Sequence, residues 1–509
     1  MQPHELEIFY DSQISEHLEE VRRLREQRNA DCSKTRNLPA EILTKIIGIL
    51  EHSDRDRWEW GWNKLSAWVQ VTHVCRAWRA FALNEPRLWT NLVAVSPDWL
   101  TDVLSRSKSA PLRLRFSDGT RYSSKYIELL NTAVTSPERI EHLEIRSDSD
   151  LLSSFTKPAP MLESLEIRSN AEFPPDFLGG SAPRLRYIKS TRALPLEASW
   201  LANVVRLECQ KVHFEAAWLS QLTTLALTEG WDAIDATSGA VRRVNVDTLL
   251  SALENMPSLQ RLSFAPPKSF DAAPSSRSAP VHLHHLHDIT VELGDKCEAM
   301  ALIFDSLMVD SIHTLETIWP RRWVEIGTLR PVCHFFATYY EGPDLHVLRC
   351  TDRDTQFSIS LDQYTVPALS FKEHHPRPLS DFMRLLPCCT PRILDTNITA
   401  TNVDSSCLRL VKALHRAPVE ELHVVSSSSV LHTLFKLSNR PNPSYPFLRR
   451  LHIKGLDDYD LVPRLKRWIA ARRSVARLEH LVIKGCDFFE EEIDSLQKIP
   501  SPTVVTILP

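Results

Sequence analysis

The chain has 509 residues, 43% hydrophobic and 24% charged, which is typical of a soluble globular protein with room for more than one domain. A formal net charge of −4 argues against a general nucleic-acid-binding protein, because such proteins carry a basic excess that neutralises phosphates. Only 12 glycines are present, which argues against nucleotide enzymes whose loops cradle phosphate.

The ten cysteines are scattered and include no C-x-x-C pair. The first residues carry no basic and apolar signal peptide, and no stretch approaches the roughly 20 apolar residues of a membrane helix. We therefore expect free thiols in a reducing compartment, the cytoplasm and/or the nucleus, and no membrane association.

Residues 1–35 are rich in Glu and Arg and are expected to form one amphipathic helix. Its apolar stripe advances by steps of three or four residues through Leu6, Tyr10, Ile14, Leu18 and Val21. The stripe is too short to indicate a coiled coil, so we expect this helix to pack on its own protein.

A second helix is expected from Leu38 to Leu50, within residues 36–92. Pro39 suits the first turn of a helix, and Glu41 complements the positive end of the helix dipole. The apolar face is wide, because Ile42, Leu43, Ile46, Ile47 and Leu50 all contribute to it. A helix this short cannot bury such a face alone, so it needs a partner.

A third helix is expected over residues 68–82, where apolar side chains recur at helical spacing. These side chains are Val71, Val74, Cys75 and Trp78, and the stretch closes with Pro86 and Trp89. The roughly 55 residues of the three parts are too few for a stable core without help, which favours association with another chain.

Together these three parts resemble an F-box. The family pattern is Leu-Pro-x-Glu-Ile-Leu, then Val-Cys-x-x-Trp, then Pro-x-Leu-Trp, and this chain has Leu38 to Leu43, Val74 to Trp78 and Pro86 to Trp89 in that order. A departure is the Trp-rich stretch Glu51 to Leu65, because compact F-boxes have a shorter connection. The charged helix before the module and the segment Trp99 to Leu114 after it are similar to the large F-box set of mushroom-forming fungi.

The resemblance implies docking on a Skp-type adaptor and, through it, on a cullin and a RING protein. The positions that would face the adaptor are Leu38, Pro39, Ile42, Leu43, Ile46, Ile47, Val74, Cys75, Trp78 and Trp89. For Val74 and Trp78 a purely internal packing role is an equal alternative, because a buried aromatic side chain usually has core partners.

Residues 93–509 repeat a segment of the form Leu-x-x-Leu-x-Ile, which alternates like a half-buried strand. Clear copies begin at residues 140, 162, 222, 259, 448 and 478, and weaker ones at 185, 204, 286, 345 and 419. Helix-like stretches lie between copies, so we expect an α/β solenoid of parallel strands and helices. The unit loosely resembles a leucine-rich repeat, and residues 320–410 fit it poorly.

Known catalytic spacings are absent, so we expect no enzyme and no cofactor. The segment from His282 to His287 is interpreted as an exposed strand edge rather than a metal site, because no carboxylate or cysteine in the pattern completes a ligand set. The pair Cys388 and Cys389 is interpreted as packed thiols. The basic run 464–473 is interpreted as the solvent-exposed face of a helix rather than as a phosphate-binding surface.

The leading hypothesis is a non-catalytic substrate-receptor subunit of a Skp-cullin-F-box type ubiquitin ligase. We expect three parts along the chain: an N-terminal amphipathic helix at residues 1–35, the F-box domain at 36–92 and a leucine-rich-repeat-like substrate-binding domain at 93–509. The sequence does not identify the protein substrate. Two alternatives stay open: an F-box scaffold that acts outside a ligase, and a metal-binding repeat protein.

Overall fold

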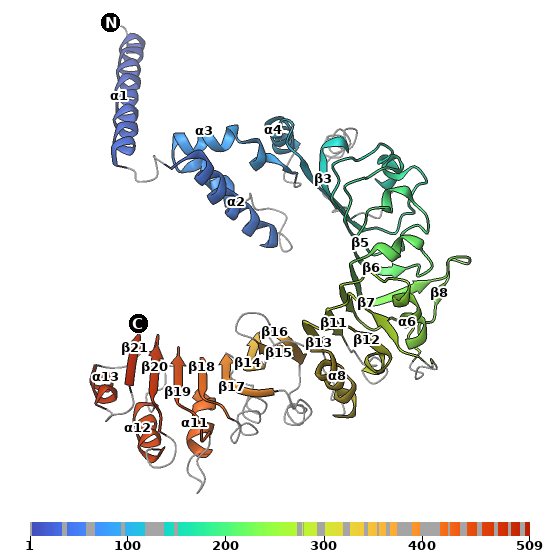
Figure 1. Cartoon of the computed structure of the whole chain (residues 1–509). Coiled ribbons are helices and arrows are strands. Elements are labelled where there is room, and N and C mark those ends of the chain that lie inside the picture. The colour runs from blue at the N-terminus through green and yellow to red at the C-terminus, as the bar shows by residue number, and fades with distance from the viewer. Residues whose placement is uncertain are drawn as a thin grey trace. The chain divides into compact units, whose positions relative to one another are not determined.

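A computed structural model describes the chain over residues 3–32, 38–57, 67–92, 97–117, 137–146, 151–271, 277, 279–292, 301–318, 326–340, 345–353, 356–362, 367–373, 389–397, 418–425, 428–437, 445–455, 461–472, 477–486, 490–498 and 504–508. The fold is mixed α/β, with helices first and parallel strands after them (Figure 1). It divides into two compact units, Met1–Arg184 and Leu185–Pro509. This division does not coincide with the domain boundaries expected above, which stay predictions. None of the helices in these ranges has both the length and the hydrophobicity of a membrane span.

The first helix, α1, spans Pro3–Cys32 as one uninterrupted element. The five residues of its expected apolar stripe are all between 39% and 57% exposed, so the packing anticipated for this stripe is not found among the described residues. Salt bridges one turn apart, such as Arg22 with Glu19 at 3.0 Å, support the helix from its polar side.

The expected F-box region forms α2 (Ala40–Arg57), η2 (Ala67–His73), α3 (Arg76–Asn84) and η3 (Pro86–Trp89). Helix α2 is longer than expected, because the first part of the anticipated Trp-rich connection continues it; residues 58–66 lie outside the described residues. The single helix expected over 68–82 is divided at Cys75. Its backbone is extended, and its Sγ accepts a hydrogen bond from the Trp78 backbone N–H at 3.5 Å, which caps α3.

Four parallel strands follow in the first unit: β1 (Asn91–Leu92), β2 (Leu112–Ser117), β3 (Ile140–Arg146) and β4 (Ser164–Arg168). The helix α4 (Pro97–Ser107) joins β1 to β2. Leu114, Leu143 and Leu165 stand in register on three neighbouring strands and are all buried. The short helices η4 (Pro137–Arg139), η5 (Leu151–Ser154) and η6 (Phe177–Gly180) lie between or after these strands.

The second unit begins with a parallel ladder of six strands: β5 (Tyr187–Ser190), β6 (Arg206–Val212), β7 (Thr224–Ile234), β9 (Arg261–Phe264), β11 (Asp288–Glu292) and β13 (Thr314–Ile318). One row of buried side chains crosses the ladder in register: Leu207, Leu225, Leu262, Ile289 and Leu315. Stacked leucine and isoleucine side chains of this kind supply the apolar burial that stabilises each strand against its neighbours.

The unit ends in a second parallel run: β17 (Cys389–Asn397), β18 (Glu421–Val425), β19 (Arg450–Lys454), β20 (His480–Lys484) and β21 (Val504–Leu508). Leu422, Leu451 and Leu481 form the matching buried row. Every copy of the recurring segment identified in the sequence therefore contains or leads into a strand.

Between these runs the order of strands reverses. Strand β13 pairs in parallel with β16 (Pro367–Glu373), which pairs in antiparallel fashion with β15 (Gln356–Asp362), and β15 pairs likewise with β14 (Leu345–Arg353). Strand β14 then pairs in parallel with β17. This meander explains why residues 320–410 fit the repeat poorly, since antiparallel neighbours need no crossover helix.

Within the described residues, the connections between strands contain both short and full helices. Three connections in which helix-like stretches were expected contain only short helices: η7 (Ser199–Leu201), η8 (Ala217–Gln221) and η10 (Leu302–Ser306). Full helices are α6 (Val246–Glu254), α8 (Ile326–Tyr339), α11 (Ser428–Leu437), α12 (Leu461–Arg472) and α13 (Glu490–Gln497). In Figure 1, α11, α12 and α13 lie on one side of strands β18 to β21. Two further strands, β10 (Val281–Leu283) and β12 (Leu307–Val309), form a separate parallel pair.

The cysteines Cys32, Cys75, Cys209 and Cys486, whose side chains the structure describes, are free thiols, as expected. The side chains of Cys388 and Cys389 lie outside the described residues. Cys209 is fully buried in β6, and burial, followed by the nearby carboxylate of Glu208, raises the pKa of its thiol to about 12.

Cys209 should consequently resist alkylation in the folded chain. A thiol reacts as its thiolate, and a raised pKa keeps Cys209 protonated at pH 8, while burial blocks the reagent. Brief iodoacetamide treatment followed by peptide mass spectrometry should label exposed Cys32 but not Cys209, and both should be labelled in denaturant. Equal labelling of both in native buffer would contradict the buried position of β6.

Candidate partner-docking site

The start of α2 is fixed by backbone hydrogen bonds. The carbonyl of Pro39 accepts hydrogen bonds from the N–H groups of Ile42 at 3.0 Å and Leu43 at 3.1 Å. Helix α2 therefore begins immediately after Pro39, and the pair Leu38–Pro39 lies at the helix entrance. Leu38 is half-buried and Pro39 is exposed, which leaves the pair available to a partner.

Helix α2 has an inner and an outer apolar face. Leu43 and Ile47 are buried, the latter completely, where α2 packs against η2 and η3. Ile42 is 39% exposed, Ile46 is half-buried, and Ile49 is 66% exposed. Ile49 was not among the residues predicted to bind a partner. Its position seven residues after Ile42 places it two turns along the same side, and that spacing was the available signal.

The second predicted segment, from Val74 to Trp78, also contains side chains that differ in exposure. Val74 is 58% exposed, and Cys75 and Trp78 are half-buried. The indole Nε1 of Trp78 is buried and has no hydrogen-bond partner among the residues described here. An unsatisfied buried donor costs free energy, and indole N–H groups usually find an acceptor when buried. This segment therefore combines an exposed apolar side chain, Val74, with an unsatisfied indole N–H at Trp78 and the exposed charges of Arg76 and Arg79.

Trp89 lies inside the module. It is 3% exposed, its Nε1 donates a hydrogen bond to the carbonyl of Ala82 at 2.7 Å, and the guanidinium of Arg106 lies 4.9 Å from its ring centroid. These contacts tie η3 to α3 and α4. Of the ten predicted positions, Trp89, Leu43 and Ile47 thus form the internal core of the folded chain, and the other seven are accessible or half-accessible.

We call the accessible set the docking face, which comprises Leu38, Pro39, Ile42, Ile46, Ile49, Val74, Cys75 and Trp78. These eight side chains are uncharged, but the exposed charged residues Glu41, Lys45, Arg76 and Arg79 lie beside them in the sequence, so contact with a partner would combine apolar burial with ion pairs. An apolar face on a small helical module, supported from within by a separate core, is able to bind another protein without unfolding.

The polar side of the strands is a second candidate surface. In the first unit Glu144 forms ion pairs with Arg115 on β2 and with Arg146 on its own strand. In the second unit Tyr187 donates a hydrogen bond to Glu208 at 3.1 Å, and Lys189 forms an ion pair with the same carboxylate. Glu144 is buried, whereas Tyr187, Lys189 and Glu208 are half-exposed, so in the second unit the polar side of the strands is partly accessible to a polar protein partner.

Three basic residues of the run 464–473 make internal contacts, whereas Arg467 is exposed and residue 473 lies outside the described residues. Arg464 contacts His432 on α11 at 2.6 Å, and Lys466 donates a hydrogen bond to Ser495 on α13 at 2.6 Å. Arg472 is 2% exposed, donates to the carbonyl of Tyr445 at 2.7 Å, and burial lowers the pKa of its guanidinium to about 10. These contacts join adjacent helices and loops, which weighs against a phosphate-binding surface.

Comparison with known proteins identifies one domain. Residues 35–94 match the family model described as F-box-like. The match covers the module that carries the docking face. No curated protein matches the sequence. The chain thus contains an F-box-like domain, and domains of this kind generally bind Skp-type adaptors and serve ubiquitin ligases as substrate receptors rather than as enzymes.

Proposed function

We propose that this chain is the substrate-receptor subunit of a Skp-cullin-F-box type ubiquitin ligase. The observation that carries the proposal is the coincidence of two features in one module. Residues 35–94 match the F-box-like model, and the same residues present the uncharged docking face over a separate buried core. The docking face binds the Skp-type adaptor, which connects the chain to a cullin and a RING protein.

The remaining chain binds the substrate. Its strands, arranged as a leucine-rich-repeat-like solenoid, carry half-buried charged side chains such as Lys189 and Glu208 on the side opposite the buried leucines. A repeat surface of this kind selects a protein through many side chains spread over several strands. The receptor supplies no catalytic group; it holds the substrate close to the ligase, so ubiquitin transfer becomes effectively intramolecular. The four cysteines whose side chains are described are free thiols, which fits an assembly in the cytoplasm or nucleus.

Co-purification of the tagged full-length chain should recover the Skp-type adaptor and the cullin together. The adaptor alone links receptor to cullin, so both should appear in one complex by quantitative mass spectrometry. Recovery of the adaptor without the cullin would favour a scaffold that acts outside a ligase. Absence of the adaptor itself would contradict the assignment of the docking face.

A further inference from the structure

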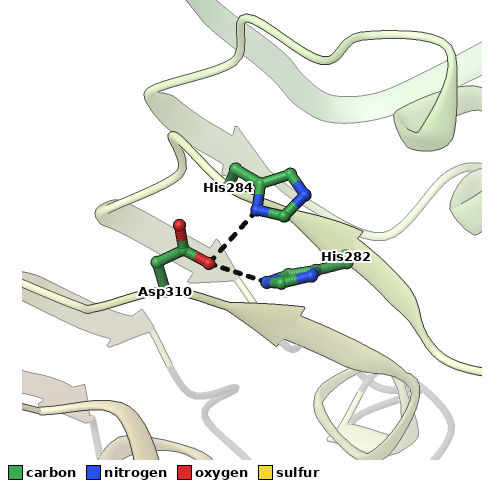
Figure 2. Close-up of side chains that lie close together, drawn as sticks. All are labelled: His282, His284 and Asp310. Carbon is green, nitrogen blue, oxygen red and sulfur yellow. Dashed lines mark hydrogen bonds and ion pairs between the residues drawn. The ribbon is translucent and has the colours of Figure 1, made fainter.

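Two histidines and an aspartate meet at the ends of the separate strand pair β10 and β12. These strands are parallel, with Leu283 opposite Val309 in register. Val281 and Leu283 point inward and are buried, so His282 and His284, which alternate with them, share the outer side. Asp310 directly follows β12 and faces both imidazoles, as Figure 2 shows.

The distances among these groups are those of potential metal ligands. Asp310 Oδ1 lies 2.8 Å from His282 Nε2 and 3.3 Å from His284 Nδ1 (Figure 2). The three ligand atoms lie within 4.8 Å of one another. Around a tetrahedral zinc ion with bonds of about 2.0–2.1 Å, neighbouring ligand atoms are about 3.3 Å apart. All three side chains are exposed, so they are able to rotate toward that geometry.

Two other clusters of this composition occur among the described residues, but in each the carboxylate has another polar or cationic partner. Asp288 accepts a hydrogen bond from the hydroxyl of Thr314 at 2.7 Å. Glu421, beside His423 and His452, lies 3.5 Å from the guanidinium of Arg450, which competes electrostatically with a metal cation. In the part of the chain that the structure describes, the recorded contacts of Asp310 are the two imidazoles.

The charge of the group also suits a cation. The carboxylate of an exposed aspartate such as Asp310 is ordinarily ionised at neutral pH. With neutral imidazoles, the group carries one negative charge. Imidazole nitrogens suit zinc, copper, nickel and iron, and magnesium and calcium prefer oxygen ligands.

We propose that His282, His284 and Asp310 form a surface site for one divalent transition-metal ion of the zinc class. The carboxylate that the sequence pattern lacked is supplied by Asp310, which directly follows β12 and lies 26 residues after His284. Solvent completes the coordination, because all three side chains are exposed. A bound ion would join the end of β10 to the end of β12 and stabilise this strand pair. The inference does not depend on adaptor binding.

Zinc binding to the full-length chain, freed of metal by chelator dialysis, tests the proposal. Titration with Zn²⁺ against a chromophoric chelator should show one tight equivalent. His284→Ala and Asp310→Asn should each weaken it at least 10- to 100-fold, the loss typical even for residues that merely support a ligand. Zn²⁺ should also raise the Tm of the wild-type chain more than that of either variant, because ligand binding to the native state stabilises it.

His285→Ala is the matched control, because His285 is an exposed histidine of the same segment that lies outside the cluster. The His285→Ala variant should still bind one equivalent of Zn²⁺ with the affinity of the wild type. Equal losses for His285→Ala and His284→Ala would overturn the proposal, since scattered surface histidines would then explain the binding. Loss of the tight equivalent in His452→Ala alone would overturn it too and place the ion at Glu421. Circular dichroism of each metal-free variant separates a binding defect from misfolding.

Discussion

Replacing Leu38 and Pro39 together by alanine should remove binding of the Skp-type adaptor and leave the fold intact. Both residues precede α2 at its entrance, and neither belongs to the fully buried core. The hydrogen bonds that start α2 use the backbone carbonyl of residue 39, which alanine retains. The loss should therefore fall on the interface. Central hot-spot contacts of an interface are typically worth about 2 kcal/mol or more each, so loss of both should weaken binding by about 4 kcal/mol, or roughly 1000-fold.

Isothermal titration of the purified adaptor into wild-type and variant chains measures this loss directly. Gln70→Ala is a suitable control, because Gln70 is exposed on η2 of the same module but lies outside the docking face. Its affinity should match that of the wild type. Ile47→Ala provides the opposite comparison: Ile47 is completely buried, so this variant should destabilise the module by about 2–5 kcal/mol. Unchanged affinity of the Leu38, Pro39 double variant would remove this segment from the interface.

Introducing aspartate at Leu262 should unfold the strand ladder of the second unit. Leu262 is 1% exposed and stands in register between Leu225 and Ile289. The change removes a buried leucine and places an unpaired carboxylate in an apolar row. Truncation of a buried leucine alone costs about 2–5 kcal/mol, and burial of an unpaired charge adds to it, so the total should exceed about 4 kcal/mol.

Ser263→Asp is the matched control for this change. Ser263 is the next residue on β9, half-exposed on the other side of the strand, with Ala226 and Thr290 as its register neighbours. Thermal unfolding followed by circular dichroism should place its Tm near that of the wild type, well above that of Leu262→Asp. The adaptor should still bind Leu262→Asp, because the docking face belongs to the other compact unit. Loss of adaptor binding would show that the two units fold together.

The strands were predictable because their signal is local. In the segment at Leu259, for example, one buried apolar residue precedes a strand and two more, Leu262 and Phe264, lie within it. Strand β13 lacked the full signal, because its third apolar position is the buried Thr317. The reversal from β14 to β16 was not predictable, since pairing partners across a meander depend on contacts between segments distant in sequence.

The same difference applies to the two candidate sites: signals within one continuous segment could be read from the sequence, and contacts between distant segments could not. The F-box resemblance depended on short motifs in one continuous span, and residues 35–94 match the F-box-like model. The pattern did not separate inner Ile47 from outer Ile42, because the apolar face of α2 is too wide for periodicity to divide. Asp310 was missed as a partner of His284 because the parallel pairing of two three-residue strands brings them together.

The junction between the F-box module and the first strands has a mechanical consequence. Strand β1 pairs with β2, the N–H of Arg113 donates to the carbonyl of Thr90 at 2.9 Å, and Arg106 covers the ring of Trp89. Hydrogen bonds and packing, rather than a flexible tether, thus connect the docking helices to β2, β3 and β4. The orientation of an adaptor bound to α2 would therefore fix the orientation of these strands relative to the adaptor. This rigid junction would limit the volume in which a substrate bound to these strands can move. It would thereby determine which lysines of the substrate reach the ligase.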